Sequence, residues 1–273
     1  MTVEVLGILA GRGDLPRRIV QHCRQIGRPY FVVAIKGQAN PGDFEAEPHA
    51  WVRLGAAGRT LALLRENDVR ELVLAGGIER PSLAALRPDS RALRFFAKLG
   101  KARFGDDGLL RAVVRALEED EGLRIVGPDQ IMGELTVQPG VIGRLTPDES
   151  AERDIARGVD VLRMISEADV GQAAVVQDGI VLGVEAVEGT DALLVRCAAL
   201  KRSGPGGVLV KIAKAGQETR VDLPTIGPET VRNAAAAGLR GIAVEAGRTL
   251  VLDRDVVARS ADEAGLFVTA IVV

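Results

Sequence analysis

The chain has 273 residues, of which 47% are hydrophobic and 26% charged, so it is long enough for one large core or two domains and too apolar to be disordered. Its net charge of −2 argues against a nucleic-acid binder, which usually carries a basic surface. The acidic start Met1-Thr2-Val3-Glu4 and the lack of an apolar run of ~18–20 residues predict a cytoplasmic protein.

Cysteine and histidine are too scarce for several common kinds of site. Cys23 and Cys197 stand far apart and form no CxxC pair, and His22 and His49 do not supply a histidine-rich zinc site. No G-x-S-x-G sequence offers a nucleophilic serine. Carboxylates, lysines, arginines and glycine loops must therefore carry any chemistry.

The first half of the chain alternates short apolar runs with helical patterns. This order predicts a Rossmann-like domain with a parallel sheet over residues 1–132. The buried strands are expected at 3–10, 30–35, 71–75 and 123–126, and the helices at 15–26, 58–67, 91–102 and 107–121.

The second half predicts a different kind of sheet. Residues 133–147 are rich in proline and glycine, which indicates a linker. Residues 148–273 predict a second α/β domain with a mixed sheet, because valine-rich runs on both sides of Gln177-Asp178-Gly179 indicate an antiparallel hairpin. Further strands are expected at 208–212, 241–244, 249–252 and 267–273, and helices at 148–168, 190–201, 228–237 and 255–264.

Two glycine loops follow predicted strands of the first domain. Gly11-Arg12-Gly13 opens a helix, where backbone N–H groups favour phosphate, and Gly76-Gly77 ends the third strand. Because ligands bind outside the carboxyl ends of parallel strands, both loops are expected to face one crevice. Arg80 is suited to bind a phosphate with two hydrogen bonds. Pro16 replaces the third glycine of a dinucleotide fingerprint, and a plain strand–helix turn also explains the first loop.

Pairs of acids stand at two predicted helix starts. Asp106 and Asp107 precede one helix, and Glu188 and Asp191 lie between an apolar strand and another. Carboxylate oxygens suit a hard cation such as Mg²⁺. Helix capping explains either pair without a metal.

Residues 211–228 concentrate charge next to a helix start. Lys211 and Lys214 are expected to project from one face of a strand, and polar and apolar residues alternate through 219–223 around Arg220 and Asp222. Residues 225–228 then lead into a helix whose N–H groups favour phosphate. The segment predicts an anion site with a metal ligand, although a solvated strand edge explains the lysines equally well.

Seven segments together form a familiar pattern: 6–16, 75–81, 105–107, 131–134, 169–172, 187–192 and 218–227. They resemble the UDP-2,3-diacylglucosamine pyrophosphatases of lipid A biosynthesis, the LpxI family. The most specific elements are Glu188-Gly189-Thr190-Asp191 and the run from Asp222 to Gly227. The resemblance extends over essentially the whole chain.

The resemblance implies a hydrolase that uses Mg²⁺, or Mn²⁺ in its place, to form UMP and 2,3-diacylglucosamine 1-phosphate (lipid X). It implies two α/β domains with the lipid product between them, and a position important for activity at Asp222. Asp222, Glu188 and Asp191 are expected to hold the metal or orient the water. Peripheral contact with the inner membrane and a homodimer are both compatible with the sequence. The expected substrate-binding residues are Gly11, Arg12, Gly13, Gly76, Gly77, Arg80, Asp106, Asp107, Gln172, Thr190, Lys211, Lys214, Arg220 and Thr225.

Two other functions remain as alternatives at this point. The opening strand–helix–strand pattern favours an NAD(P)-dependent oxidoreductase, against which the missing third glycine argues. A nucleotide-sugar or lipid binding protein without catalysis is opposed only by the clustered acids. Dependence of turnover on Mg²⁺ separates the hydrolase from both.

Overall fold

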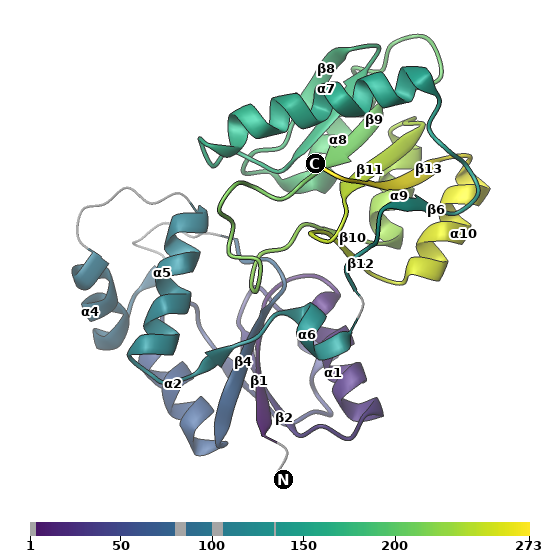
Figure 1. Ribbon diagram of the computed structural model, residues 1–273. Helices are drawn as coiled ribbons and strands as arrows, with labels where there is room; N and C mark the ends of the chain where they lie inside the picture. Colours follow the sequence, from purple (N-terminus) through teal and green to yellow (C-terminus); the bar gives the residue numbers. More distant parts are fainter. Residues whose placement is uncertain (1–3, 80–85, 100–105, 134) are drawn as a thin grey trace. The chain divides into compact units, whose positions relative to one another are not determined.

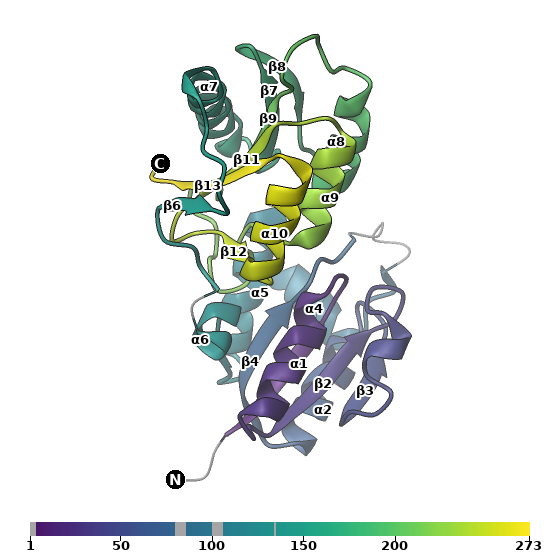
Figure 2. The ribbon, with the colours of Figure 1, turned by 90° about the vertical axis from the view of Figure 1, so that its right-hand side faces the viewer.

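The structure is a computed structural model that describes residues 4–79, 86–99, 106–133 and 135–273. Contacts divide the chain into two compact units, Met1–Gly133 and Glu134–Val273. Each unit has its own main sheet with helices on both faces (Figures 1 and 2). The expected α/β fold class, with one parallel and one mixed sheet, is therefore confirmed.

The first unit is a five-stranded sheet in the order β3-β2-β1-β4-β5, and all of its strand pairs are parallel. Helices α1 and α6 lie on one face, and α2, α4 and α5 lie on the other (Figure 1). The strands are β1 (Val5–Ala10), β2 (Tyr30–Ile35), β3 (His49–Val52), β4 (Val69–Ala75) and β5 (Arg124–Ile125). The helices are α1 (Leu15–Gln25), η1 (Pro41–Asp43), α2 (Ala57–Glu66), α4 (Ser90–Leu99), α5 (Asp106–Glu119) and α6 (Pro128–Met132).

Alternating residues of β1 explain how both faces of this sheet are covered. Leu6 and Ile8 are fully buried in a cluster that includes Ile19 of α1. Gly7 points to the opposite face, where a Cβ atom would lie 2.7 Å from the side chain of Val69. The strand is therefore apolar throughout, because helices pack on both of its faces.

The second unit contains a six-stranded sheet in the order β6-β13-β11-β9-β7-β8. The three central strands β9, β11 and β13 are parallel, whereas β7 runs antiparallel to both β8 and β9, and β6 antiparallel to β13. The strands are β6 (Gly140–Ile142), β7 (Ala173–Gln177), β8 (Ile180–Val184), β9 (Val208–Lys211), β10 (Thr225–Ile226), β11 (Gly241–Glu245), β12 (Leu250–Val251) and β13 (Phe267–Ile271). The helices are α7 (Glu149–Ser166), α8 (Gly189–Ala198), α9 (Pro228–Ala236) and α10 (Arg254–Ala264).

Helix α7 covers one face of this sheet, and α8, α9 and α10 cover the other (Figure 2). The two-residue period of the strands produces these layers. Val208 and Val210 of β9 join the cluster with α7 residues, whereas Leu209 joins the cluster with α8, α9 and α10. The predicted hairpin is present, with Asp178 and Gly179 at φ values of 53° and 74° between β7 and β8.

Three local expectations differ from the structure. Residues 140–142 lie in the expected linker but form β6, which pairs with β13, so this segment belongs to the second unit. Residues 219–221 form a turn instead of continuing a strand-like alternation. Residues 49–52 form the edge strand β3, which the polar sequence before it does not predict. In all three places the decisive contacts are with residues distant in the sequence.

Neither cysteine forms a disulfide: Cys23 and Cys197 are both free and buried, in agreement with a role as small apolar core residues. Within the described ranges, no helix combines the length and the apolar character needed to cross a membrane.

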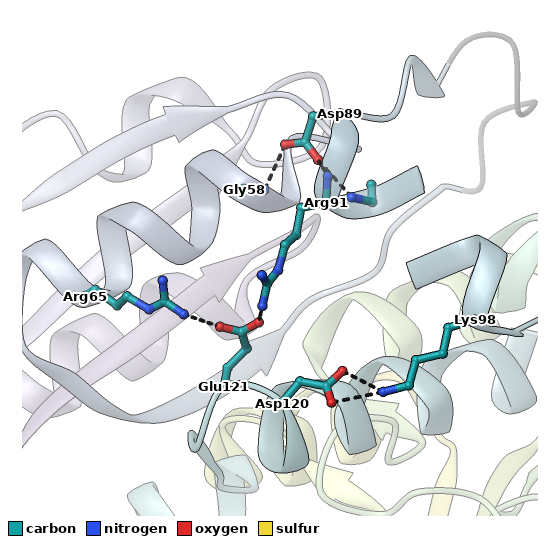
Figure 3. Close-up of polar contacts among 8 residues, drawn as sticks. Gly58, Arg65, Asp89, Arg91, Lys98, Asp120 and Glu121 are labelled. Carbon is teal, nitrogen blue, oxygen red and sulfur yellow. Dashed lines mark hydrogen bonds and ion pairs between the residues drawn. The ribbon is translucent and has the colours of Figure 1, made fainter. Parts of the chain in front are cut away.

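One carboxylate of the first unit stabilises the starts of two helices. Asp89 directly precedes α4 and accepts hydrogen bonds from the backbone N–H groups of Arg91 and Ala92 at 3.1 and 2.9 Å. Its second oxygen accepts from the N–H of Gly58 in the first turn of α2 at 2.8 Å (Figure 3). Because Ala56 at the N-cap of α2 has no side-chain acceptor, Asp89 caps both helices.

We expect Asp89→Ala to lower the free energy of unfolding by about 1–2 kcal/mol, the usual cost of losing an N-cap. Partial burial raises the pKa of Asp89, but the backbone N–H donors outweigh it, so the pKa lies below its usual 3.8. The stabilisation by charge is therefore present above that value and is lost as the pH falls through the lowered pKa. Thermal melts of wild type and Asp89→Asn should differ at neutral pH and converge in acid; a constant difference would contradict this.

Candidate active site

The two glycine loops of the first unit pair with each other. The N–H of Gly11 donates to the carbonyl oxygen of Ala75 at 2.8 Å, and Arg12 and Gly77 exchange backbone hydrogen bonds of 2.8 and 3.1 Å. The loops follow β1 and β4, which are neighbours at the carboxyl edge where the strand order reverses. This is the place where open α/β sheets bind ligands. The expectation that both loops face one place is confirmed by these contacts.

Side chains near these loops are held by partners. The Arg12 guanidinium forms an ion pair of 2.6 Å with Glu79, and the N–H of Glu79 donates to the side chain of Gln38 after β2. Gly13, at a φ of 86°, has open space around its Cα. Arg80 lies outside the described residues, and Asp106 and Asp107 form the first turn of α5.

A cavity of about 240 Å³ lies elsewhere in the same unit. It is lined by Arg28, Glu71 and Arg124, near the amino ends of β4 and β5. Glu71 is buried and forms ion pairs with both arginines. Because the glycine loops follow the carboxyl ends of β1 and β4, this cavity belongs to the opposite edge of the sheet.

The contact between the loops makes a substitution of Gly76 costly. Its φ is 85°, and a Cβ atom there would lie 2.2 Å from the carbonyl oxygen of Arg12. We expect Gly76→Ala to lower the free energy of unfolding by about 1–3 kcal/mol. Gly77→Ala is the matched control, because a Cβ atom there meets nothing within 4 Å. Urea denaturation of both variants measures the difference, and equal midpoints would contradict the expected loop geometry.

In the second unit, polar residues gather where three strands end. Lys211 is the last residue of β9, Glu245 is the last of β11, and Glu185 directly follows β8. Since β8 and β9 both run antiparallel to β7, these three residues lie at the same edge of the sheet. All three are buried, which is rare for charged residues unless they have partners.

Lys211 joins two of the segments singled out in the sequence. Its Nζ donates to Thr190 Oγ1 at 2.9 Å and to the carbonyl oxygen of Thr225 at 3.1 Å. Burial lowers the pKa of Lys211, while the carboxylates of Glu185, Asp191 and Asp222 act in the opposite direction. The second unit thus brings Thr190, Asp191, Lys211, Asp222 and Thr225 into one polar cluster.

Asp222 is held within this cluster by two glutamines. Gln217 Nε2 donates to Asp222 Oδ2 at 2.6 Å and to Gln172 Oε1 at 3.2 Å, and its side-chain carbonyl accepts from the N–H of Lys214. Gln217 is only 6% exposed. The buried amide therefore connects Asp222 to Gln172, two residues that the sequence analysis places in the site.

The two acids at the start of α8 have different surroundings. Asp191 Oδ1 accepts from Asn233 Nδ2 of α9 at 2.8 Å. Glu188 accepts from Arg196 at 2.6 Å and from the N–H of Ala186 at 3.2 Å. The hydrogen bond from Arg196 holds the pKa of Glu188 below its usual value. Asp191 acts on Lys211, whereas the contacts of Glu188 lie with its own helix and the preceding turn.

Lys214 does not share a strand face with Lys211, contrary to expectation. Strand β9 ends at Lys211, so Lys214 lies in the following loop, where it forms an ion pair with Asp169. Arg220 forms an ion pair of 2.8 Å with Glu218 in the next turn. The alternation in the sequence was misleading because the chain leaves the sheet after residue 211.

The acids suit a metal that also binds the substrate. Across the described parts of the chain, no three acidic, histidine or cysteine side chains come together as a metal-binding group. Asp191 and Asp222 nevertheless both lie within electrostatic range of the Lys211 ammonium. Mg²⁺ in proteins is commonly held by one or two carboxylates together with phosphates of the substrate. Two carboxylates among hydroxyl and amide oxygens fit that pattern.

Sequence reasoning gave no role to Glu185 or Gln217. Glu185 Oε1 accepts from the hydroxyl of Thr190 at 2.7 Å, and Oε2 accepts from the N–H of Gln172 at 3.1 Å. The available signal was a charged residue at the end of the apolar run Val181–Val184. Gln217 had no comparable signal, because its burial depends on how the loop folds.

Two solved structures show only a weak likeness. The NAD complex of UDP-glucose 4-epimerase from Thermus thermophilus is 14% identical over 98% of this chain and 85% of that chain, with a TM-score of 0.34. The biotin carboxylase domain of 2-oxoglutarate carboxylase from Hydrogenobacter thermophilus is 14% identical over 71% and 40%, with a TM-score of 0.24. Neither likeness supports a conclusion about this protein.

The sequence relatives are informative. Sequence models of the LpxI N-terminal and C-terminal domains match residues 5–135 and 138–269. The UDP-2,3-diacylglucosamine pyrophosphatase LpxI of Caulobacter vibrioides is 44% identical over 273 residues, which cover 97% of each chain. With both domains matched in order and the full-length relative at this identity, the chain belongs to the LpxI family.

Proposed function

We propose that this protein hydrolyses the pyrophosphate of UDP-2,3-diacylglucosamine to UMP and 2,3-diacylglucosamine 1-phosphate. The observation that carries the proposal is the 44% identity to the Caulobacter vibrioides pyrophosphatase over 97% of both chains. The polar cluster of the second unit supports it, because it combines carboxylates, buried amides and a cation at one sheet edge. Hydrolysis of a phosphoanhydride needs such groups to position the reactants and offset charge.

The proposal includes a divalent metal, Mg²⁺ or Mn²⁺, held by Asp191 and Asp222. When bound, it would neutralise charge on the diphosphate oxygens. Asp222 is oriented by Gln217, and Asp191 by Asn233, so both carboxylates have one oxygen fixed by an amide. Glu188 was expected to join them, but its hydrogen bonds to Arg196 and Ala186 give it a different first role. We therefore rank the pair Asp191 and Asp222 above Glu188.

Other parts of the site follow from the contacts. Lys214 and Arg220 are proposed to bind diphosphate oxygens by exchanging their present carboxylate partners, Asp169 and Glu218, for the substrate. The paired glycine loops of the first unit are proposed to bind the nucleotide through backbone N–H groups at the start of α1. Peripheral contact with the inner membrane would give access to a substrate with two acyl chains; that contact, a homodimer and a lipid product between the domains stay predictions.

The test is product analysis by mass spectrometry after incubation with UDP-2,3-diacylglucosamine in ¹⁸O-labelled water. We expect UMP and 2,3-diacylglucosamine 1-phosphate, with the label in one of them identifying the phosphorus that water attacks. Binding of the substrate without either product would favour a binding protein instead. Binding of NADH, detected by nicotinamide fluorescence, together with no hydrolysis would favour the oxidoreductase.

A further inference from the structure

Lys211 is buried in a way that does not suit a direct contact with phosphate. The residue is 7% exposed, and two of the three N–H donors of an ammonium group are used inside the protein. A side chain that grips a ligand anion needs an accessible charged end. The interactions of Lys211 are instead with protein groups from two different segments.

Those two segments carry the proposed metal ligands. Thr190 immediately precedes Asp191 at the start of α8, and Thr225 lies three residues after Asp222. By binding the hydroxyl of Thr190 and the carbonyl of Thr225, Lys211 links the backbone around one carboxylate to the backbone around the other. Among the described strands, no pairing performs this task, since β10 pairs with β12 and α8 follows β8.

Glu185 completes the link from the opposite side. The Thr190 hydroxyl donates its proton to Glu185 Oε1 at 2.7 Å, which leaves its lone pairs to accept from Lys211. Glu185 Oε2 accepts from the N–H of Gln172 and so fixes the carboxylate in place. Glu185 also supplies negative charge near the buried ammonium. Carboxylate, hydroxyl and ammonium therefore form one continuous chain of hydrogen bonds.

We propose that Glu185 and Lys211 are positioning residues: acting through Thr190, they hold Asp191 and Asp222 at the separation needed for the metal and the diphosphate. This inference rests on the proposed function. Neither residue contacts the reacting atoms in this scheme. Their effect is on geometry, and a displacement of about 1 Å at a reacting centre can cost about 10²-fold in rate.

The experiment compares Glu185→Gln, Lys211→Met and Thr190→Val with two controls. Glu185→Gln keeps the shape of the side chain but replaces one acceptor oxygen with a donor. Thr190→Ser keeps the hydroxyl and should retain at least a third of wild-type kcat, whereas Thr190→Val should reproduce the loss. Asp154→Asn is the matched buried carboxylate, because Asp154 is 2% exposed and accepts from the N–H groups of Asp178 and Gly179 in the β7–β8 hairpin.

Two readouts are measured for each variant. In steady-state assays at saturating Mg²⁺, the three test variants should lose about 10- to 100-fold in kcat while KM stays within about threefold. In the metal-free protein, hydrogen–deuterium exchange should become faster in peptides covering both 186–192 and 222–227. Asp154→Asn should speed exchange only around residues 177–180 and leave kcat unchanged.

The outcomes decide between positioning and direct contact. A rise of more than tenfold in KM with unchanged exchange would mean that Lys211 binds substrate itself, which would overturn the proposal. Faster exchange in only one of the two segments would also overturn it, because the link would then be absent. If the wild-type protein fails to cleave the substrate, the proposed function fails, yet the exchange data still show whether Glu185 and Lys211 tie the two segments together.

Discussion

Replacing Asp222 with alanine is expected to leave a folded protein whose kcat is reduced by about 10²–10⁴-fold, the range typical of a positioned acid–base group. Asp222 lies beyond a turn, and its side chain accepts a hydrogen bond from Gln217. Removing a partly exposed loop acid should change the free energy of unfolding by about 1 kcal/mol or less. The large effect should therefore appear in the rate and not in the thermal melt.

Two further variants make this expectation specific. Asp222→Asn keeps an oxygen that can accept from Gln217 but removes the charge, so a comparable loss of kcat would assign the effect to the charge. Asp160→Ala, on the exposed side of α7, is the control for losing an acid of the same unit. Substrate binding by Asp222→Ala, measured as retention of uncleaved substrate, should persist. If this variant kept more than about a third of wild-type kcat, Glu188 with Asp191 would become the leading pair.

Much of the fold could be predicted from periodicity because most strands are short apolar runs bounded by glycine or proline. The strands β1, β2 and β4 and the glycine loops after β1 and β4 follow directly from such runs. That the loops meet also follows, since adjacent parallel strands end at one edge. The elements that were missed, β3 and β6, have four and three residues and sit at sheet edges, where a short sequence window contains little pattern.

The composition of the site was less predictable than the fold. Thr190, Asp191, Lys211, Asp222, Thr225 and Gln172 were all named from the sequence, and the structure connects them through hydrogen bonds or electrostatic range. The sequence did not show that Lys211 is buried or that Lys214 leaves the strand, because both depend on where β9 ends. Glu185 and Gln217 escaped notice because polar residues acquire meaning as connectors only after the chain has folded around them.

Removal of divalent metal is expected to abolish hydrolysis, and Mg²⁺ or Mn²⁺ should restore it. The cluster offers carboxylate, hydroxyl and amide oxygens, which suit hard cations, and the two histidines of the chain lie in the first unit. Loss of several kcal/mol of charge stabilisation corresponds to more than about 10²-fold in rate. The measurement is turnover after dialysis against EDTA, with Mg²⁺-saturated EDTA as the control for effects of the chelator itself.

The structure sharpens this expectation, because only two carboxylates are proposed to bind the metal and the described residues contain no group of three. The diphosphate must then complete the coordination, so metal alone should bind weakly and substrate should increase its affinity. Titration of Mn²⁺ by electron paramagnetic resonance, with and without substrate on the Asp222→Asn protein, measures this coupling. Asp191→Asn should raise the Mg²⁺ concentration needed for half-maximal rate, whereas Glu188→Gln should leave it within about twofold, since Glu188 is engaged by Arg196. Full activity in excess EDTA would contradict the metal, and an effect of Glu188→Gln equal to that of Asp191→Asn would show that Glu188 exchanges Arg196 for the cation.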